Sequence, residues 1–381
     1  MADMREFRVD IPQSDIDELR SKLAATRWPD RETVPDWSQG IPLAYVRELV
    51  EYWAEDYDMR RVERLLNAHP QYQVTVDGVD LHVLHVRSPH EDARPLLLTH
   101  GWPGSVLEFL ETIEPLTEPT KHGGSADDAF HLVIPALPGY GFSAKPTVAG
   151  TDVDRIADLW HQLMQILGYP RYHAQGGDWG AIVTTAMAMK APPGLLGVHV
   201  NFAVASPDAL AGLGELTPDE QSVGGLPRYM EQEAGYSTQQ GTRPQTLGYA
   251  LADSPVGQLA WIVEKFYPWT DWEGHPENAV SRDKMIDAVM IYWLTNSATS
   301  SSRLYWESLL SALGTFPEVA LASAYSQFPR ELFTISERWL RTRFTDLRYY
   351  GTVKRGGHFA ALEQPELFVA EVRAAIRALP S

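Results

Sequence analysis

The chain has 381 residues, 44% of them hydrophobic and 22% charged, and its 50 acidic side chains against 32 basic ones give a net charge of −18. This charge disfavours nucleic-acid binding because a phosphate backbone would be repelled, and the absence of cysteine excludes disulfides, thiolate metal sites and cysteine nucleophiles. The N-terminal residues lack the apolar core of a signal peptide, and no apolar run approaches the roughly 18 residues of a membrane helix, so we expect a cytoplasmic protein without a membrane partner.

Residues 1–70 have the pattern of amphipathic helices, and we predict a helical N-terminal extension that packs on the rest of the chain. Over residues 71–205 the pattern changes to short apolar strands that alternate with amphipathic helices. The strands include "PLLLT" (95–99), "HLVIPA" (131–136), "YHAQGG" (172–177) and "LLGVHV" (195–200). This alternation predicts an α/β fold with a mostly parallel sheet and helices on both faces.

Residues 206–310 are rich in helix-forming, aromatic and polar residues and contain no obvious strand, which predicts a helical insertion. Strand-like segments return at "ELFTIS" (331–336) and "LRYYGTV" (347–353), and "PELFVAEVRAAIRAL" (365–379) predicts a closing helix. Residues 311–381 therefore form the second part of the sheet domain in this prediction.

The segment "AQGGDWGA" (174–181) has the outline of a nucleophile elbow, the G-x-S-x-G turn between a strand and a helix, but it carries Asp178 at the central position. Gly176 and Gly180 permit a tight turn that would push the side chain of Asp178 outward. An aspartate before a helix is also a common N-cap. The flanking glycines and the preceding strand favour a nucleophile.

A second glycine-rich loop, "HGWPGS" (100–105), directly follows the strand "PLLLT". A loop in this position can turn a backbone N–H toward the site as half of an oxyanion hole. The amide of Trp102 is the candidate donor, and the amide of Trp179 is the candidate second donor. Taken alone, the loop could be a simple strand-to-helix turn.

In α/β-hydrolases the base histidine follows the nucleophile and comes late in the chain, and His358, in "RGGHF", is the one of 12 histidines in that position. An acid that orients it should lie between Asp178 and His358. Glu331 in "SQFPREL" is the candidate, with Asp346 and Glu337 as weaker rivals.

Together these motifs resemble the microsomal-type epoxide hydrolases of the α/β-hydrolase superfamily, and the resemblance covers essentially the whole chain. The matching segments are "HGWPGS" (100–105), "PALPGYGFS" (135–143), "GGDWG" (176–180), "ADSPVG" (252–257) and "RGGHFAALEQPE" (355–366), with "FRVDIP" and "LRSKLAATRWPD" near the N-terminus. The resemblance implies an α/β-hydrolase core with an inserted helical cap and an N-terminal helical extension. Membrane-bound relatives carry an N-terminal anchor, which we do not expect here.

The resemblance also implies roles for individual residues. Asp178 corresponds to the nucleophile, His358 to the general base and Glu331 to its acid partner. Two cap tyrosines would hold and protonate the epoxide oxygen, and the best matches are Tyr236 and Tyr305. Two other tyrosines, Tyr292 and Tyr267, are nearby rivals for this role.

A carboxylate suits attack on a saturated epoxide carbon because it forms an ester, which water can cleave, whereas a serine would form a stable ether. This chemistry needs no metal and no organic cofactor. We expect an epoxide and water as small-molecule partners, and a homodimer is compatible with the sequence. A haloalkane dehalogenase, which also uses an aspartate followed by tryptophan, and a non-catalytic ligand-binding protein are the alternatives.

The tryptophans of the predicted cap favour an apolar or aryl epoxide, although core packing explains them equally well. They are Trp261, Trp269, Trp272 and Trp293. The sequence leaves open whether the reaction serves detoxification or the biosynthesis of a natural product.

Overall fold

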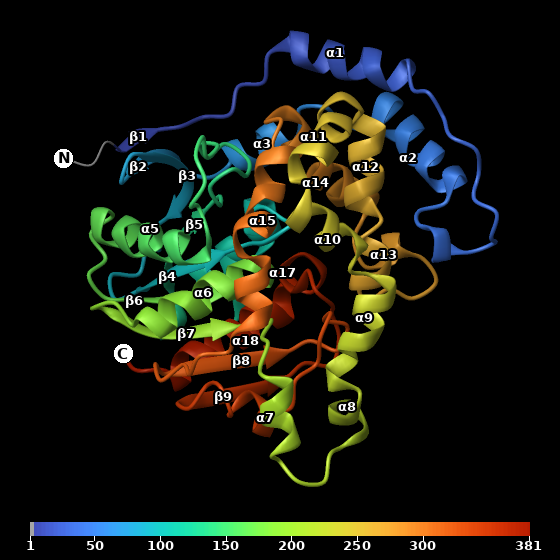
Figure 1. Ribbon diagram of the computed structural model, residues 1–381. Helices are drawn as coiled ribbons and strands as arrows, with labels where there is room; N and C mark the ends of the chain where they lie inside the picture. The colour runs from blue at the N-terminus through green and yellow to red at the C-terminus, as the bar shows by residue number, and fades with distance from the viewer. Residues whose placement is uncertain (1–3) are drawn as a thin grey trace.

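The computed structural model describes residues 4–381 and is built around a nine-stranded sheet with the strand order β1-β2-β3-β5-β4-β6-β7-β8-β9 (Figure 1). The strands are β1 (Met4–Glu6), β2 (Gln71–Val76), β3 (Val79–Val86), β4 (Arg94–Thr99), β5 (Phe130–Pro135), β6 (Tyr172–Gly176), β7 (Leu195–Val200), β8 (Ser323–Gln327) and β9 (Leu347–Thr352). In the sheet order β5-β4-β6-β7-β8-β9, each pair of neighbouring strands is parallel. The pairs β1–β2, β2–β3 and β3–β5 are antiparallel. The predicted α/β fold is confirmed.

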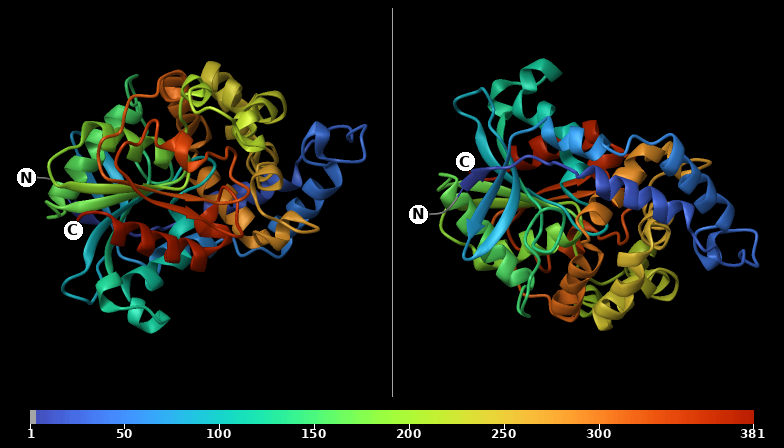
Figure 2. Two further views of the ribbon diagram at one scale, coloured as in Figure 1. Left: turned by 90° about the horizontal axis from the view of Figure 1, so that it is seen from below. Right: turned by 90° about the horizontal axis from the view of Figure 1, so that it is seen from above.

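Helices cover both faces of this sheet (Figure 2). Helices α5 (Val153–Ile166) and α6 (Asp178–Lys190) pack together on one face, and α4 (Leu110–Thr117) and α18 (Pro365–Ala378) pack together on the other. All residues of β5 and β6 are buried. No side of these central strands faces water, and even the polar His173 and Gln175 of β6 are buried.

The N-terminal extension contains helices α1 (Gln13–Ala24), α2 (Leu43–Glu55) and α3 (Arg61–Asn67), as its periodicity predicts. The prediction of helix alone was wrong at the start, because Met4–Glu6 form β1 and pair with β2. All three residues of β1 are exposed. An edge strand without a buried face shows no alternation, so only the pairing with β2 determines it.

Between β7 and β8 the described chain is helical, and it forms the cap over the sheet (Figure 1). The cap helices are α7 (Pro207–Ala211), α8 (Pro218–Gln221), α9 (Leu226–Gln232), α10 (Gly235–Thr242), α11 (Pro244–Asp253), α12 (Pro255–Val263), α13 (Phe266–Trp269), α14 (Arg282–Leu294) and α15 (Ala298–Gly314). The domain boundaries drawn from the sequence stay a prediction. Among residues 4–381, no helix has both the length and the apolar character needed to cross a membrane.

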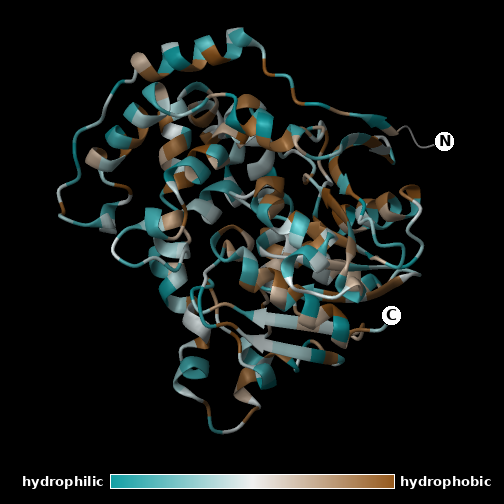
Figure 3. Ribbon diagram, turned by 180° about the vertical axis from the view of Figure 1, so that it is seen from behind, coloured by the Kyte–Doolittle hydropathy of each residue, from teal (hydrophilic) through white to brown (hydrophobic). Residues whose placement is uncertain are grey.

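The strand predicted at residues 331–336 was wrong. The strand that precedes β9 is β8, eight residues earlier, and residues 331–336 form a loop with bends. Strand β8 has the sequence SAYSQ, whose small and polar residues carry little hydropathy, and its ribbon is pale in Figure 3. All five residues are nevertheless buried, because β7 and β9 enclose β8 on either side.

Hydrogen bonds attach the N-terminal extension to the cap, where three tyrosines in or after α2 donate to carboxylates in or before α14. The pairs are Tyr45 with Glu277 (2.9 Å), Tyr52 with Asp283 (2.6 Å) and Tyr57 with Asp287 (2.6 Å). Arg61 adds an ion pair to Asp287 at 2.9 Å. Hydrogen bonds to charged groups contribute about 1.5–3 kcal/mol each, so the extension holds α14 in place above the core.

Candidate active site

Asp178 lies in a sharp turn between β6 and α6. Strand β6 ends at Gly176, α6 begins at Asp178, and the φ of Asp178 is +50°, in the left-handed region. A Cβ at residue 176 would lie 2.2 Å from the carbonyl oxygen of Gly180, so glycine is required where the strand and the helix meet. The N-cap of α6 is Gly177, and no side chain caps the helix. Asp178 therefore does not act as a helix cap, and its left-handed backbone is of the kind that clusters at active sites.

The loop after β4 contacts the carboxylate of Asp178 directly. The backbone N–H of Trp102 donates to Oδ1 of Asp178 at 2.7 Å. His100, at the start of the same loop, is fully buried; its Nε2 accepts from the N–H of Leu137 at 3.2 Å. Burial lowers the pKa of His100 to about 4, so this histidine is neutral and structural. The loop thus contributes a backbone donor to the site.

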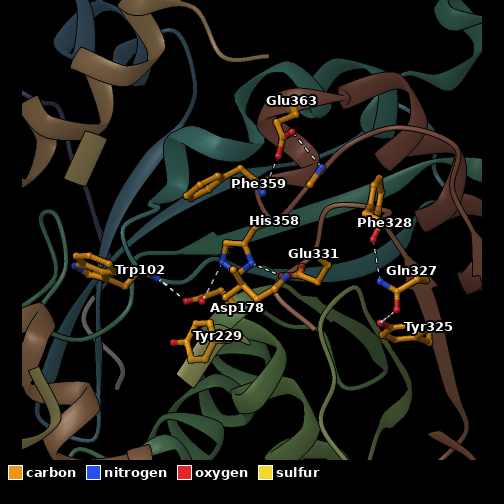
Figure 4. A network of polar contacts seen from close by, with 12 residues as sticks. Trp102, Asp178, Tyr229, Tyr325, Gln327, Phe328, Glu331, His358, Phe359 and Glu363 are labelled. Carbon is orange, nitrogen blue, oxygen red and sulfur yellow. Dashed lines mark hydrogen bonds and ion pairs between the residues drawn. The ribbon is translucent and has the colours of Figure 1, made fainter. Parts of the chain in front are cut away.

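His358 stands between Asp178 and Glu331 (Figure 4). Its Nε2 lies 3.1 Å from Oδ2 of Asp178, and its Nδ1 lies 2.5 Å from Oε1 of Glu331. The side chains of His358 and Glu331 are 1% and 0% exposed, whereas that of Asp178 is 15% exposed. The three residues that the sequence singles out therefore meet at one point of the structure.

The backbone explains why Glu331 reaches His358. An isolated parallel bridge pairs Arg330 with Gly357, and the N–H of Arg330 donates to the carbonyl of Gly356. The two rivals lie elsewhere, since Glu337 pairs with Arg341 in α16 (Glu337–Leu340) and Asp346 pairs with Arg348.

The charges around His358 stabilise its protonated form. Burial alone would lower the pKa of His358, but the carboxylates of Glu331 and Asp178 raise it well above the usual value. The neighbouring carboxylates therefore favour the imidazolium form of His358.

A residue that the sequence reasoning missed fixes the histidine loop. Glu363 is buried, and its carboxylate accepts from the backbone N–H groups of Gly357, Phe359 and Asp271 at 3.1, 3.0 and 2.8 Å. The His358 N–H donates to the carbonyl of Trp269 at 2.8 Å. The short spacing between Glu363 and His358 is visible in the sequence, but the cap-side partner of Glu363, Asp271, is 92 residues away in the chain.

Two tyrosines of the cap face Asp178 across a small cavity of about 50 Å³. They are the two predicted ones, Tyr236 of α10 and Tyr305 of α15. Tyr236 stacks on the ring of Trp102 at 5.0 Å, and Tyr305 meets the ring of Trp179 edge-on at 4.8 Å. Burial raises the pKa of both phenols well above the usual value, so they are protonated at neutral pH.

The rival tyrosines have other partners. Tyr292 donates to the carbonyl of Gly104 at 2.8 Å, and Tyr267 stacks on Trp37 of the N-terminal extension at 4.2 Å. A third tyrosine of the cavity, Tyr229, was missed by the sequence reasoning. Its hydroxyl contacts the hydroxyls of Tyr236 at 3.1 Å and of Ser237 at 3.4 Å.

Apolar side chains complete the cavity beside Asp178. They include Ile182, Phe202, Leu309, Leu332 and Phe333. Three of the cap tryptophans do not line this cavity. Trp269 packs on the ring of His358 at 5.1 Å, Trp261 donates to Gln240, and Trp272 donates to the carbonyl of Tyr267. Core packing therefore explains these three tryptophans.

Within residues 4–381, no group of three or more histidine, aspartate or glutamate side chains is placed to hold a metal ion. The chemistry available at this site consists of a carboxylate in a strained turn, a histidine–glutamate pair, backbone donors and protonated phenols. This set can attack an electrophilic carbon, protonate the departing oxygen and activate water.

Comparison with known proteins agrees with this set of groups. Residues 4–109 match the family model described as epoxide hydrolase N terminus, and residues 94–235 match that of the alpha/beta hydrolase fold. The chain is 52% identical over 374 residues to a protein of Stigmatella aurantiaca that is named as an epoxide hydrolase. The matched region covers 98% of this chain and 84% of the relative. The chain belongs to the epoxide hydrolase family.

Two further relatives of the enzyme extend the comparison. The chain is 33% identical over 406 residues to epoxide hydrolase 1 of Oryctolagus cuniculus, covering 97% of this chain and 88% of the relative. Its structure matches that of juvenile hormone epoxide hydrolase from Bombyx mori with a TM-score of 0.90 at 31% identity, covering 99% and 95% of the two chains. The predicted epoxide hydrolase activity is confirmed, which disfavours a dehalogenase and a non-catalytic binding protein.

Proposed function

We propose that this epoxide hydrolase converts an apolar epoxide to a vicinal diol through a covalent ester on Asp178. In the first step the carboxylate attacks an epoxide carbon, the carbon–oxygen bond of the ring breaks, and a cap tyrosine gives its proton to the released oxygen. In the second step water cleaves the ester. The two steps replace one difficult displacement by water with two easier reactions.

The position of Asp178 between two kinds of donor carries this proposal. On the core side, Trp102 N–H and His358 Nε2 hold the two carboxylate oxygens. On the cap side lie Tyr236 and Tyr305, and no described residue accepts a hydrogen bond from the buried Tyr305 hydroxyl. A buried hydroxyl without an acceptor is rare in folded proteins. An epoxide oxygen in the cavity would be that acceptor.

The second step uses the core side. Forming the ester removes the charge of Asp178, which is one cause of the raised pKa of His358. His358 can then lose its proton to solvent and act as the base that deprotonates water, and it takes a proton back from solvent when the charge of Asp178 returns. The hydroxide adds to Cγ of Asp178, and the oxyanion is stabilised by the N–H of Trp102 and, in our proposal, by that of Trp179 at the positive N-terminus of α6.

Proton balance closes the cycle. His358 returns the proton it took from water to the departing alkoxide, so that the diol leaves. The remaining proton of the attacking water passes from the regenerated Asp178 carboxyl to the tyrosinate formed in the first step. Glu331 keeps the tautomer of His358 with Nε2 toward the ester and stabilises the imidazolium.

The cavity supports an apolar or aryl epoxide as substrate. Apart from Asp178, Ser237 and the tyrosine hydroxyls, its lining consists of apolar and aromatic side chains. Such a lining contributes binding energy by burying apolar surface and leaves orientation to the few polar groups.

The mechanism is tested by trapping the ester. A His358→Gln variant mixed with styrene oxide, as an aryl epoxide probe, should gain the mass of one substrate molecule on intact-protein mass spectrometry, and the label should map to the peptide that contains Asp178. An Asp178→Ala variant with an unchanged circular dichroism spectrum should neither gain this mass nor form diol. Diol formation by Asp178→Ala at the wild-type rate would refute the covalent mechanism.

A further inference from the structure

A second cavity, which none of the tyrosines lines, also reaches Asp178. It has a volume of about 10 Å³, and Asp178 is the single residue that it shares with the cavity that holds Tyr236 and Tyr305. We call these two spaces the inner cavity and the substrate cavity. A volume of this size is about the minimum that holds one water molecule, provided that polar partners are present.

Polar groups line the inner cavity where the proposed mechanism requires water. His358 and Asp178 form one wall, and Asn201 and Glu108 are further polar residues of the lining. The amide oxygen of Asn201 already accepts from Gln175 at 2.8 Å. Of the lining residues outside the catalytic groups, Glu108 is thus the one with a carboxylate to offer to a water.

Glu108 is held at the boundary of the inner cavity. It belongs to η2 (Val106–Phe109), a short 3-10 helix after the "HGWPGS" loop. A Cβ at residue 104 would lie 1.3 Å from Oε1 of Glu108, so the glycine at 104 leaves the space that this carboxylate occupies. The loop that provides the Trp102 donor therefore also makes room for Glu108.

Glu108 also lines an outer cavity of about 70 Å³ at the junction of the core, the cap and the N-terminal extension. The inner and outer cavities have Glu108, Phe359 and Ala361 in common. The other charged residues that line the outer cavity are Arg61, Glu111, Lys284 and Asp287. Glu108 thus separates the space beside Asp178 from a space that charged residues border.

We propose that Glu108 is a positioning residue for ester hydrolysis: its carboxylate accepts a hydrogen bond from the water in the inner cavity and aims that water at Cγ of Asp178. This inference rests on the two-step mechanism proposed above. One hydrogen of the water points to Nε2 of His358, which removes it. The other hydrogen points to an oxygen of Glu108 and stays on the water. Water then attacks from the inner cavity, while the alkyl group occupies the substrate cavity.

The role of Glu108 as an acceptor rests on its position. Burial raises the pKa of Glu108 to about 8; His358 opposes the rise, and the charge of Asp178 contributes to it. Alkylation of Asp178 lowers the pKa of Glu108 and loss of the His358 proton raises it, so the two changes oppose each other. A carboxyl group offers an acceptor oxygen to water in either protonation state.

A single-turnover experiment with styrene oxide tests the role of Glu108. Rapid acid quench followed by mass spectrometry measures ester formation and ester decay separately. For Glu108→Gln we expect ester formation within about twofold of wild type and ester decay about 10- to 100-fold slower, because a misplaced nucleophile is costly. Glu111→Gln is the matched control. Glu111 lies three residues from Glu108, its carboxylate pairs with Lys284, and it lines the outer cavity but not the inner one. We expect wild-type rates for both of its steps.

Three outcomes separate the explanations. Ester decay at the wild-type rate in Glu108→Gln, while His358→Gln still traps the ester, would overturn this inference and leave the mechanism standing. Equal slowing of both steps with a lowered melting temperature would show a structural role and would also overturn it. Absence of any ester in both wild type and His358→Gln would instead refute the covalent mechanism itself.

Discussion

The two halves of the active site are held in different ways. On the core side, Asp178, His358 and Glu331 are joined to one another or to the backbone by short hydrogen bonds. On the cap side, Tyr236 and Tyr305 are held by ring packing on tryptophans, and both residues line the substrate cavity. The hydrogen bonds of the core half are complete within the protein, whereas the buried Tyr305 hydroxyl has no hydrogen-bond partner among the described residues. In the proposed mechanism the epoxide oxygen supplies this missing acceptor.

The largest effect should come from breaking the core half at its most buried point. Glu331→Gln removes the charge that favours the imidazolium form and the tautomer of His358, and we expect kcat to fall about 1000-fold or more. Ester should accumulate, because the hydrolysis step depends on the histidine. Steady-state kinetics and intact mass measure both effects. Glu337→Gln, at the surface of α16, should retain wild-type kcat; a similar loss there would argue against the specific role of Glu331.

Breaking the cap half should slow the first step instead. Tyr305→Phe and Tyr236→Phe each remove one donor to the epoxide oxygen, and we expect ester formation to slow by about 10- to 100-fold in each single variant. The double variant should lose nearly all activity. Pre-steady-state quench measures ester formation, and Tyr267→Phe, whose ring stacks outside the cavity, is the control. An unchanged rate in both single variants would rule out these phenols as acids.

The pH dependence should differ between the halves. Hydrolysis needs neutral His358, so its single-turnover rate should rise with pH, about tenfold per unit below the pKa of His358 in the ester, and then level off. Ester formation needs protonated phenols, whose pKa values lie well above the usual value, so it should show no alkaline loss up to pH 9. A loss of ester formation between pH 7 and 9 would contradict the tyrosine assignment.

The smallest effect on chemistry should come from the junction that supports the cap. Tyr57→Phe leaves Asp287 without the donor that it has at 2.6 Å, and we expect the free energy of unfolding to fall by about 1–3 kcal/mol. Because Tyr57 lies outside both cavities that reach Asp178, kcat should stay within about threefold of wild type. Urea denaturation and steady-state kinetics compare the variant with Tyr72→Phe, which should be near neutral. A large loss of kcat would tie the junction to catalysis.

The core half of the site was predictable because local motifs mark it. A glycine-flanked aspartate after an apolar strand and a late histidine in a glycine-bearing loop each occur once in the chain. The cap half was predictable only through the resemblance, since Tyr236 and Tyr305 are two of 16 tyrosines in segments without a motif. Strand β8 was missed because its residues carry no apolar signal of their own.

The sequence by itself determined the alternation of strands and helices, the family, and the candidates Asp178, His358 and Glu331, because each depends on residue type at short range. The tertiary structure decided which groups meet. The Glu363 contacts that fix the histidine loop, the place of Tyr229 beside Tyr236 and the inner cavity at Glu108 all join segments far apart in the chain. Such contacts follow from the packing of the cap and the extension on the core, which no local pattern records.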